Sequence, residues 1–133
     1  MTVFVDSSFL FALFNDDDEF YQRAVKTVEK LEKKTICFLI SNIVVAEVVN
    51  LTFRLKGAVA SQKIFSLIGK SGIEKVFINQ EVYNQAYKLL FAQKSKKGLN
   101  FFDCLHLSTM KHLNIERILT FDQAFKKEVK VIG

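Results

Sequence analysis

The chain has 133 residues, half of them hydrophobic, and its 19 Lys and Arg against 14 Asp and Glu give a formal net charge of +5. This length and composition fit one compact domain, residues 1–133, and exclude a long disordered tail or a pair of domains. No apolar run is long enough to span a bilayer and no signal-peptide pattern opens the chain, so we expect a soluble cytoplasmic protein without a membrane partner.

The first half of the chain alternates between short β-branched segments and longer periodic ones. "TVFV" at residues 2–5 predicts a strand, and the "DSS" that follows can cap a helix. Residues 16–34 carry apolar side chains near helical spacing, with acids first and lysines last, and predict a helix. We expect a buried strand at residues 35–40. Residues 42–56 are rich in β-branched side chains, but their length and apolar spacing favour a helix.

The second half of the chain continues this alternation. The predicted elements are helices at residues 58–70, 80–97 and 101–113 and strands at residues 74–78, 117–120 and 129–132. Strands that alternate with helices imply right-handed crossovers and a mostly parallel sheet that is covered on both faces. The predicted fold class is therefore α/β, a three-layer α/β/α sandwich with a mostly parallel central sheet.

Two acids directly follow predicted strands. Asp6 ends the first strand, and Asp122 follows "RILTF" at the end of another. In open α/β sheets, ligand sites form outside the carboxyl ends of the strands, so both carboxylates are expected at the same edge of the sheet.

Two further acids stand in apolar surroundings. Glu47 would share a helix face with Ile43 and Leu51, and Asp103 lies in "NFFDCLHLSTM", in the first turn of its predicted helix. A lone buried carboxylate is costly unless it is protonated or paired. These acids therefore need an explanation.

Each of the four acids also has a purely structural interpretation. Asp6 can be a strand-end cap, Asp103 a first-turn residue favoured by the helix dipole, and Asp122 an N-cap for "QAFKK". Glu47 can be an exposed residue. Together, however, four carboxylates at one edge would repel one another unless cations lay among them. Oxygen ligands without a His or Cys cluster favour Mg²⁺ or Mn²⁺ over zinc.

The segments that contain these acids resemble the motifs of the PIN domain family, and the size and layout are similar to a stand-alone ribonuclease of the VapC toxin type. "VFVDSSFL", "SNIVVAEVVN", "NFFDCLHLSTM" and "ILTFDQAF" match the four acidic segments of the family in order and spacing. The resemblance implies that Asp6, Glu47, Asp103 and Asp122 are the catalytic, metal-binding acids. It further implies Mg²⁺ or Mn²⁺ as cofactor, RNA as substrate, a small antitoxin as partner and a homodimer.

Several other polar residues have two interpretations each. Ser8 can orient Asp6 or cap the helix that follows, and Arg54 can pair with an acid of the site or contact substrate. Lys94, Lys96 and Lys97 can meet RNA phosphates or complement a helix dipole. If the four acids bind metal, 14 − 4 = 10 acids remain against 19 bases, which favours a phosphate backbone as ligand.

Three other features favour a structural role. Residues 16–19, "DDDE", have the spacing of a capping box at the start of a predicted helix and are expected to be a solvated cap. His106 and His112 are six positions apart, unlike a zinc-binding pair, and are expected in the core or on the surface. Cys37 and Cys104 are expected as buried thiols rather than a disulfide or a metal site.

Other functions remain open at this point. An inactive domain of the same fold could serve as an RNA-binding or scaffold module, although it would not need all four acids. An RNA-processing nuclease without an antitoxin is a further alternative. A receiver-type phosphotransfer domain would have paired acids after its first strand, where this chain has Ser7 and Ser8, and a P-loop NTPase is excluded because GxxxxGK[ST] does not occur.

Overall fold

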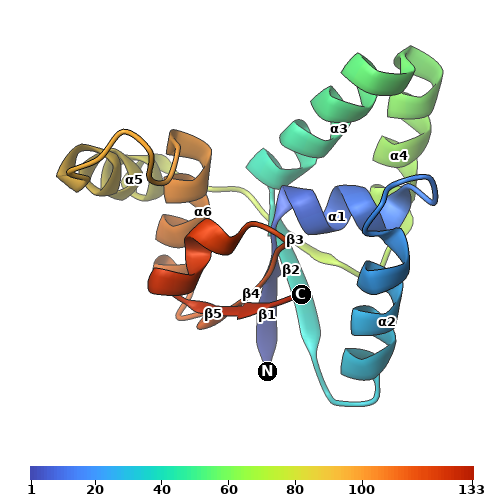
Figure 1. The fold of residues 1–133 in the computed structure, drawn as a ribbon, viewed down its shortest axis with the longest axis horizontal. Helices are drawn as coiled ribbons and strands as arrows, with labels where there is room; N and C mark the ends of the chain where they lie inside the picture. The colour runs from blue at the N-terminus through green and yellow to red at the C-terminus, as the bar shows by residue number, and fades with distance from the viewer.

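A computed structural model describes all residues from Met1 to Gly133. Its centre is a sheet of five parallel strands in the order β3-β2-β1-β4-β5 (Figure 1). The strands are β1 (Thr2–Val5), β2 (Cys37–Ser41), β3 (Glu74–Val76), β4 (Arg117–Leu119) and β5 (Lys130–Ile132). This α/β architecture confirms the predicted fold class.

Helices cover both faces of the sheet. They are α1 (Ser7–Phe14), α2 (Tyr21–Glu32), α3 (Asn42–Lys56), α4 (Ala58–Lys70), α5 (Gln80–Ala92), α6 (Phe101–His112) and the short 3-10 helix η1 (Gln123–Lys127). In Figure 1, α1 and α2 lie on one side of the sheet and α5 and α6 on the other, while α3 and α4 project beyond the carboxyl ends of the strands. None of the helices is long and apolar enough to cross a membrane.

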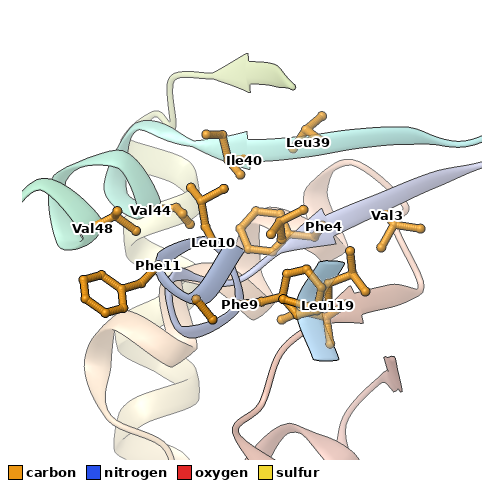
Figure 2. Packing of buried hydrophobic residues seen from close by; sticks show 14 of the residues in the cluster. Val3, Phe4, Phe9, Leu10, Phe11, Leu39, Ile40, Val44, Val48 and Leu119 are labelled. Atoms are coloured by element: carbon orange, nitrogen blue, oxygen red, sulfur yellow. The ribbon is translucent and has the colours of Figure 1, made fainter. Parts of the chain in front are cut away.

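The hydrophobic core surrounds β1, the central strand. Phe4 faces Leu39 of β2 and Ile118 of β4 in the strand register, and its side chain is fully buried. Leu10 of α1 and Val44 of α3 pack into the same cluster (Figure 2). Burial on both faces explains why β1 is a continuous hydrophobic run rather than an alternating one.

The segment at residues 42–56 is a helix with the predicted bounds. The Ser41 hydroxyl caps it by accepting a hydrogen bond from the Val44 backbone N–H at 3.3 Å. Val44 and Val48 are fully buried, so packing outweighs the weak helix propensity of their β-branched side chains.

The helix predicted at residues 16–34 begins later, at Tyr21, and the expected capping box is wrong. The acids before it form a turn, in which the Asp18 carboxylate accepts a hydrogen bond from the Phe20 backbone N–H at 2.9 Å. Asp17 instead pairs with Lys56 of α3 at 2.7 Å. This long-range ion pair could not be inferred from local spacing.

The helix predicted at residues 80–97 ends earlier, at Ala92. The Gln93 side chain donates to the Leu99 carbonyl oxygen and accepts from the Leu99 N–H, both at 2.7 Å. These two bonds close a loop over residues 94–98 that replaces the last predicted turn of the helix.

Both cysteines are free thiols, as expected. Cys104 is buried in α6. Cys37 is only half-buried, and its Sγ donates a hydrogen bond to the Glu74 carboxylate at 3.2 Å. The expectation of a buried thiol is therefore correct for Cys104 and wrong for Cys37, which lies near the amino end of β2.

Candidate active site

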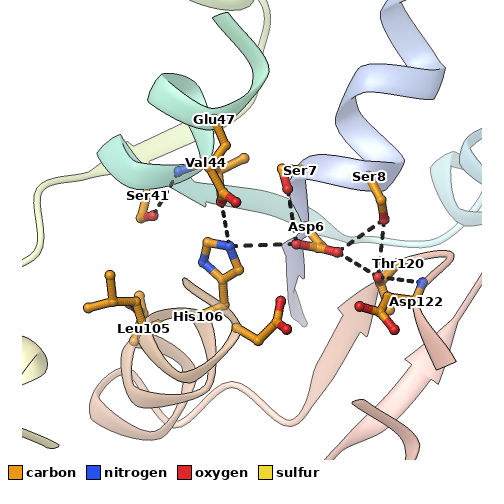
Figure 3. Close-up of polar contacts among 12 residues, drawn as sticks. Asp6, Ser7, Ser8, Ser41, Val44, Glu47, Leu105, His106, Thr120 and Asp122 are labelled. Atoms are coloured by element: carbon orange, nitrogen blue, oxygen red, sulfur yellow. Dashed lines mark hydrogen bonds and ion pairs between the residues drawn. The ribbon is translucent and has the colours of Figure 1, made fainter. Parts of the chain in front are cut away.

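Asp6 lies at the carboxyl end of β1, directly before α1, and is only 4% exposed. Its carboxylate does not cap α1. Instead, Oδ2 accepts hydrogen bonds from the Thr120 hydroxyl at 2.6 Å and the Ser8 hydroxyl at 3.0 Å (Figure 3). Oδ1 accepts a longer bond from the Ser7 hydroxyl at 3.4 Å. Asp6 is therefore held in one orientation by neutral donors.

The loop after β4 fixes the two hydroxyls that hold Asp6. The Phe121 backbone N–H donates to Ser8 Oγ at 3.2 Å, and the Asp122 backbone N–H donates to Thr120 Oγ1 at 3.0 Å. Because each hydroxyl accepts a backbone hydrogen, its own hydrogen is free to point at the carboxylate. Of the two interpretations of Ser8, the structure shows the contact with Asp6.

His106 of α6 connects Asp6 with Glu47 of α3. Its Nε2 donates to Glu47 Oε1 at 2.7 Å and lies 3.6 Å from Asp6 Oδ1 (Figure 3). His106 is almost fully buried, and its ring packs against Phe4 at 5.5 Å between ring centroids. Its buried Nδ1 has no hydrogen-bond partner. The imidazole thus orients Glu47, which is otherwise half-buried.

Asp103 is the third residue of α6 and takes part in a capping box. Its Oδ2 accepts a hydrogen bond from the Asn100 backbone N–H at 3.1 Å, and Asn100 Oδ1 accepts one from the Asp103 N–H at 2.9 Å. Burial raises the pKa of Asp103 to about 6; the Asn100 hydrogen bond opposes this rise, the negative charges of Asp6 and Asp122 add to it, and His106 counteracts it. Asp103 is therefore close enough to Asp6 and Asp122 for their charges to change its pKa.

Asp122 is exposed and caps η1, where its Oδ1 accepts a hydrogen bond from the Ala124 N–H at 2.9 Å. This is the structural interpretation that the sequence offered. Its carboxylate makes no hydrogen bond with Asp6, but its negative charge contributes to the raised pKa of Asp103. Asp122 is thus at the rim of the site.

The structure joins Asp6 and Glu47 through His106 and leaves Asp103 and Asp122 engaged in helix caps. As the side chains lie, no three His, Cys, Asp or Glu residues are grouped as a metal site requires. The donor set still fits a hard divalent cation, because it consists of carboxylate oxygens. The raised pKa of Asp103 also reflects a repulsion among these acids that a cation would relieve.

Sequence reasoning missed two residues of this arrangement, His106 and Thr120. His106 follows Asp103 by three positions, so both lie on the same face of α6, and this spacing was the available signal. Thr120 comes directly after β4, at the same sheet edge as Asp6. A hydroxyl at a strand end is a weaker signal than a carboxylate, because Ser and Thr are common at strand ends and in turns.

The raised pKa of Asp103 predicts a pH dependence of stability in the metal-free protein. Between pH 3.8, the ordinary pKa, and about 6, the folded state keeps a proton that the unfolded state releases. The free energy of unfolding should therefore fall as pH rises through 6, by about 1 kcal/mol after solvent screening. Urea unfolding measured between about pH 4.5 and 7.5 follows this decline, and Asp103→Asn should remove it. Parallel profiles for the two proteins would contradict the assignment.

Comparison with known proteins gives one family match. The PIN domain family model matches residues 3–129. No curated protein matches the sequence significantly.

Solved structures with the same fold include proteins from toxin–antitoxin systems. The VapC20 toxin of Mycobacterium tuberculosis, described as cleaving the sarcin-ricin loop, has a TM-score of 0.80 and 24% identity, with 94% of this chain and 93% of that chain covered. VapBC2 of Rickettsia felis, bound to a DNA fragment from its promoter, has a TM-score of 0.75 and 18% identity over 99% and 98% of the two chains. A toxin–antitoxin complex from Klebsiella pneumoniae has a TM-score of 0.67 and 20% identity, with 98% and 96% covered. At these identities the comparison establishes a shared fold.

Proposed function

The chain belongs to the PIN domain family, and we propose that it is a metal-dependent endoribonuclease that cleaves phosphodiester bonds of RNA. The observation that carries the proposal is the pairing of Asp6 and Glu47 through His106 at the carboxyl edge of the parallel sheet, with Asp103 close enough for its pKa to respond. Carboxylates gathered at such an edge, with one of them buried and another with a raised pKa, are typical of a reaction centre.

We propose Asp6, Glu47, Asp103 and Asp122 as the residues that hold Mg²⁺ or Mn²⁺. When bound, such an ion polarises the scissile phosphate and favours deprotonation of an attacking water. Glu47 and Asp103 keep part of their surface exposed, whereas Asp6 is buried, so Asp6 would form the floor of the site.

The surrounding residues have distinct roles in this proposal. Ser8 and Thr120 hold the Asp6 carboxylate in place, and the capping box of α6 holds Asp103. His106 orients Glu47. No side chain needs to act as a nucleophile. The remaining surface carries an excess of Lys and Arg, which supports binding of a phosphate backbone.

The direct test is cleavage of structured and single-stranded RNA by the purified protein with Mg²⁺, with Mn²⁺ and with EDTA. The proposal expects cleavage with either metal and none with EDTA. Equal cleavage in EDTA would contradict the metal dependence. An inactive protein that still binds RNA would favour a binding module.

Metal should also stabilise the protein. A ligand that binds only the native state raises the free energy of unfolding by RT ln(1 + [L]/Kd), about 2.7 kcal/mol at a hundredfold excess over Kd. We expect Mg²⁺ or Mn²⁺ to raise the Tm in differential scanning fluorimetry because it relieves carboxylate repulsion. Asp6→Asn should abolish this shift, whereas an unchanged Tm of the wild type at saturating metal would count against a cation site.

We propose that this protein acts in the cytoplasm as the toxin of a toxin–antitoxin pair and forms a homodimer. One structure that shares its fold is described as a toxin–antitoxin complex and another as a toxin, which supports an antitoxin partner. A neighbouring gene for a short DNA-binding protein, and its co-purification with this chain, would test the pairing. Expression of this chain alone is expected to arrest growth, and co-expression of the neighbouring gene is expected to relieve the arrest. Size-exclusion chromatography of the purified chain tests the homodimer.

A further inference from the structure

A pocket of about 570 Å³ opens beside the candidate active site. It lies between the start of α1, one face of α3 and the first turn of α6, and its walls include Ser7, Ser8 and Glu47. Ser7 and Ser8 donate hydrogen bonds to Asp6, and Glu47 accepts one from His106. The pocket is therefore continuous with the carboxylates and shares side chains with them.

The α3 wall of the pocket combines polar and apolar groups. Asn50 and Arg54 follow Glu47 by three and seven positions, so all three side chains lie on one face of the helix. Both Asn50 and Arg54 are exposed. Ile43 and Leu51 line the same pocket with apolar surface.

The opposite wall includes an exposed aromatic ring. Phe102 is 46% exposed although it stands directly before Asp103. Its ring lies edge to face with the Phe101 ring, with 6.0 Å between the ring centroids. Phe101 stacks on Tyr87 of α5, with 4.6 Å between the centroids. This aromatic cluster holds Phe102 at the pocket.

We propose that this pocket binds one unpaired nucleobase of an RNA strand, next to the phosphate held at the acids. The inference rests on the proposed ribonuclease function and specifies its substrate contact. Single-stranded RNA is recognised by stacking of bases on aromatic rings and by hydrogen bonds to base edges. Phe102 supplies the ring, Asn50 supplies an amide with both donors and an acceptor, and Arg54 supplies a guanidinium for a flanking phosphate.

The composition of the pocket favours a nucleobase over an apolar side chain of a protein partner. An apolar side chain would leave Asn50 and Arg54 facing it without partners, which is costly once water is excluded. A base satisfies the polar groups with its edge and covers Phe102 with its face. Residues 50 and 102 are thus assigned to contact the base and residue 54 to contact a phosphate, and all three are distinct from the proposed metal-binding acids.

The test combines substrate and protein changes. A series of RNA oligonucleotides with an abasic residue at each position around the cleavage site is cleaved under single-turnover conditions by the wild type and by Phe102→Leu. Phe65→Leu, which alters a ring of α4 that is 59% exposed and lies outside the pocket, is the matched control. In parallel, the same RNAs with 2-aminopurine at each position are titrated in EDTA to measure binding without cleavage.

The proposal expects one position where loss of the base weakens binding or cleavage by about tenfold. At that position Phe102→Leu should remove the penalty and the 2-aminopurine quenching, whereas Phe65→Leu should retain both. Asn50→Ala should change the preference among bases there. If the wild type cleaves RNA and Phe102→Leu leaves every abasic penalty unchanged, the pocket assignment is wrong and the ribonuclease function stands. If the wild type binds RNA without cleaving it, the 2-aminopurine quenching alone tests the pocket, and unchanged quenching in Phe102→Leu contradicts the assignment. If the wild type neither binds nor cleaves RNA, both proposals fail.

Discussion

Replacement of Asp6 or Asp103 by Asn is expected to lower metal-dependent cleavage of RNA by on the order of a thousandfold or more, since each change removes a negative charge from the proposed metal site. Asn has nearly the same shape as Asp, so the effect is one of charge. Single-turnover cleavage at saturating Mg²⁺ measures it.

The stability of the two variants should differ, because the structure gives the two carboxylates different surroundings. Asp103→Asn removes a group whose pKa is raised to about 6, and the Asn amide oxygen can still accept the capping hydrogen bond, so this variant should be more stable above pH 6. Asp6 accepts the Ser8 and Thr120 bonds through the same oxygen, Oδ2, and the amide oxygen of Asn can still accept both. Only the longer Ser7 bond to Oδ1 is lost, so we expect a change within about 1 kcal/mol.

Asp17→Asn is the matched control for this pair of variants. Asp17 is an acid of the same type, it lies outside the site, and its ion pair with Lys56 is largely exposed. This variant should keep full activity. Full activity in Asp6→Asn and Asp103→Asn would refute the site. Equal loss of activity in Asp17→Asn would show that the loss is not specific to the proposed site.

Phe4→Ala should cause the largest loss of stability, about 3–5 kcal/mol, through lost burial and the cavity that remains. Phe4 is fully buried in the central strand, and its ring lies 5.5 Å from the His106 ring, between centroids. The cavity would thus open directly beneath the residue that orients Glu47. Urea unfolding with linear extrapolation measures the free energy, and the cleavage rate of the folded fraction should fall as well.

Two companion variants show whether the Phe4 effect is specific. Phe4→Leu keeps most of the buried volume and should cost less than half as much, while Phe65→Ala changes an exposed ring and should cost within about 0.5 kcal/mol. If Phe4→Ala costs as little as Phe65→Ala, the packing of β1 against His106 is not as described.

The order of strands and helices was predictable from sequence because each element has a strong apolar pattern. Residues 42–56 show this best: their apolar spacing identified α3 even though β-branched side chains crowd the helix. The errors lie at element ends, where long-range contacts decide. Asp17 pairs with the Lys56 ammonium of α3, and Asp18 closes a turn before the start of α2 by accepting a bond from Phe20. The Gln93 side chain ends α5 by bonding to Leu99.

The four acids proposed for the site were selected from strand ends and from carboxylates in apolar surroundings, and the PIN resemblance agreed with that choice. Their connections were not found. Whether His106 packs as a core residue or reaches Glu47 depends on how α3 and α6 meet at the sheet edge, which a linear sequence does not state. The role of Thr120 likewise depends on the parallel pairing of β1 with β4.

An anomalous difference map from crystals soaked with Mn²⁺ tests the central claim most directly. The account predicts a peak at the sheet edge with oxygens of both Asp6 and Asp103 within about 2.0–2.3 Å, and no such peak in crystals of Asp6→Asn. A map with no peak there at saturating Mn²⁺, or with manganese held only by the acids at residues 16–19, would contradict it.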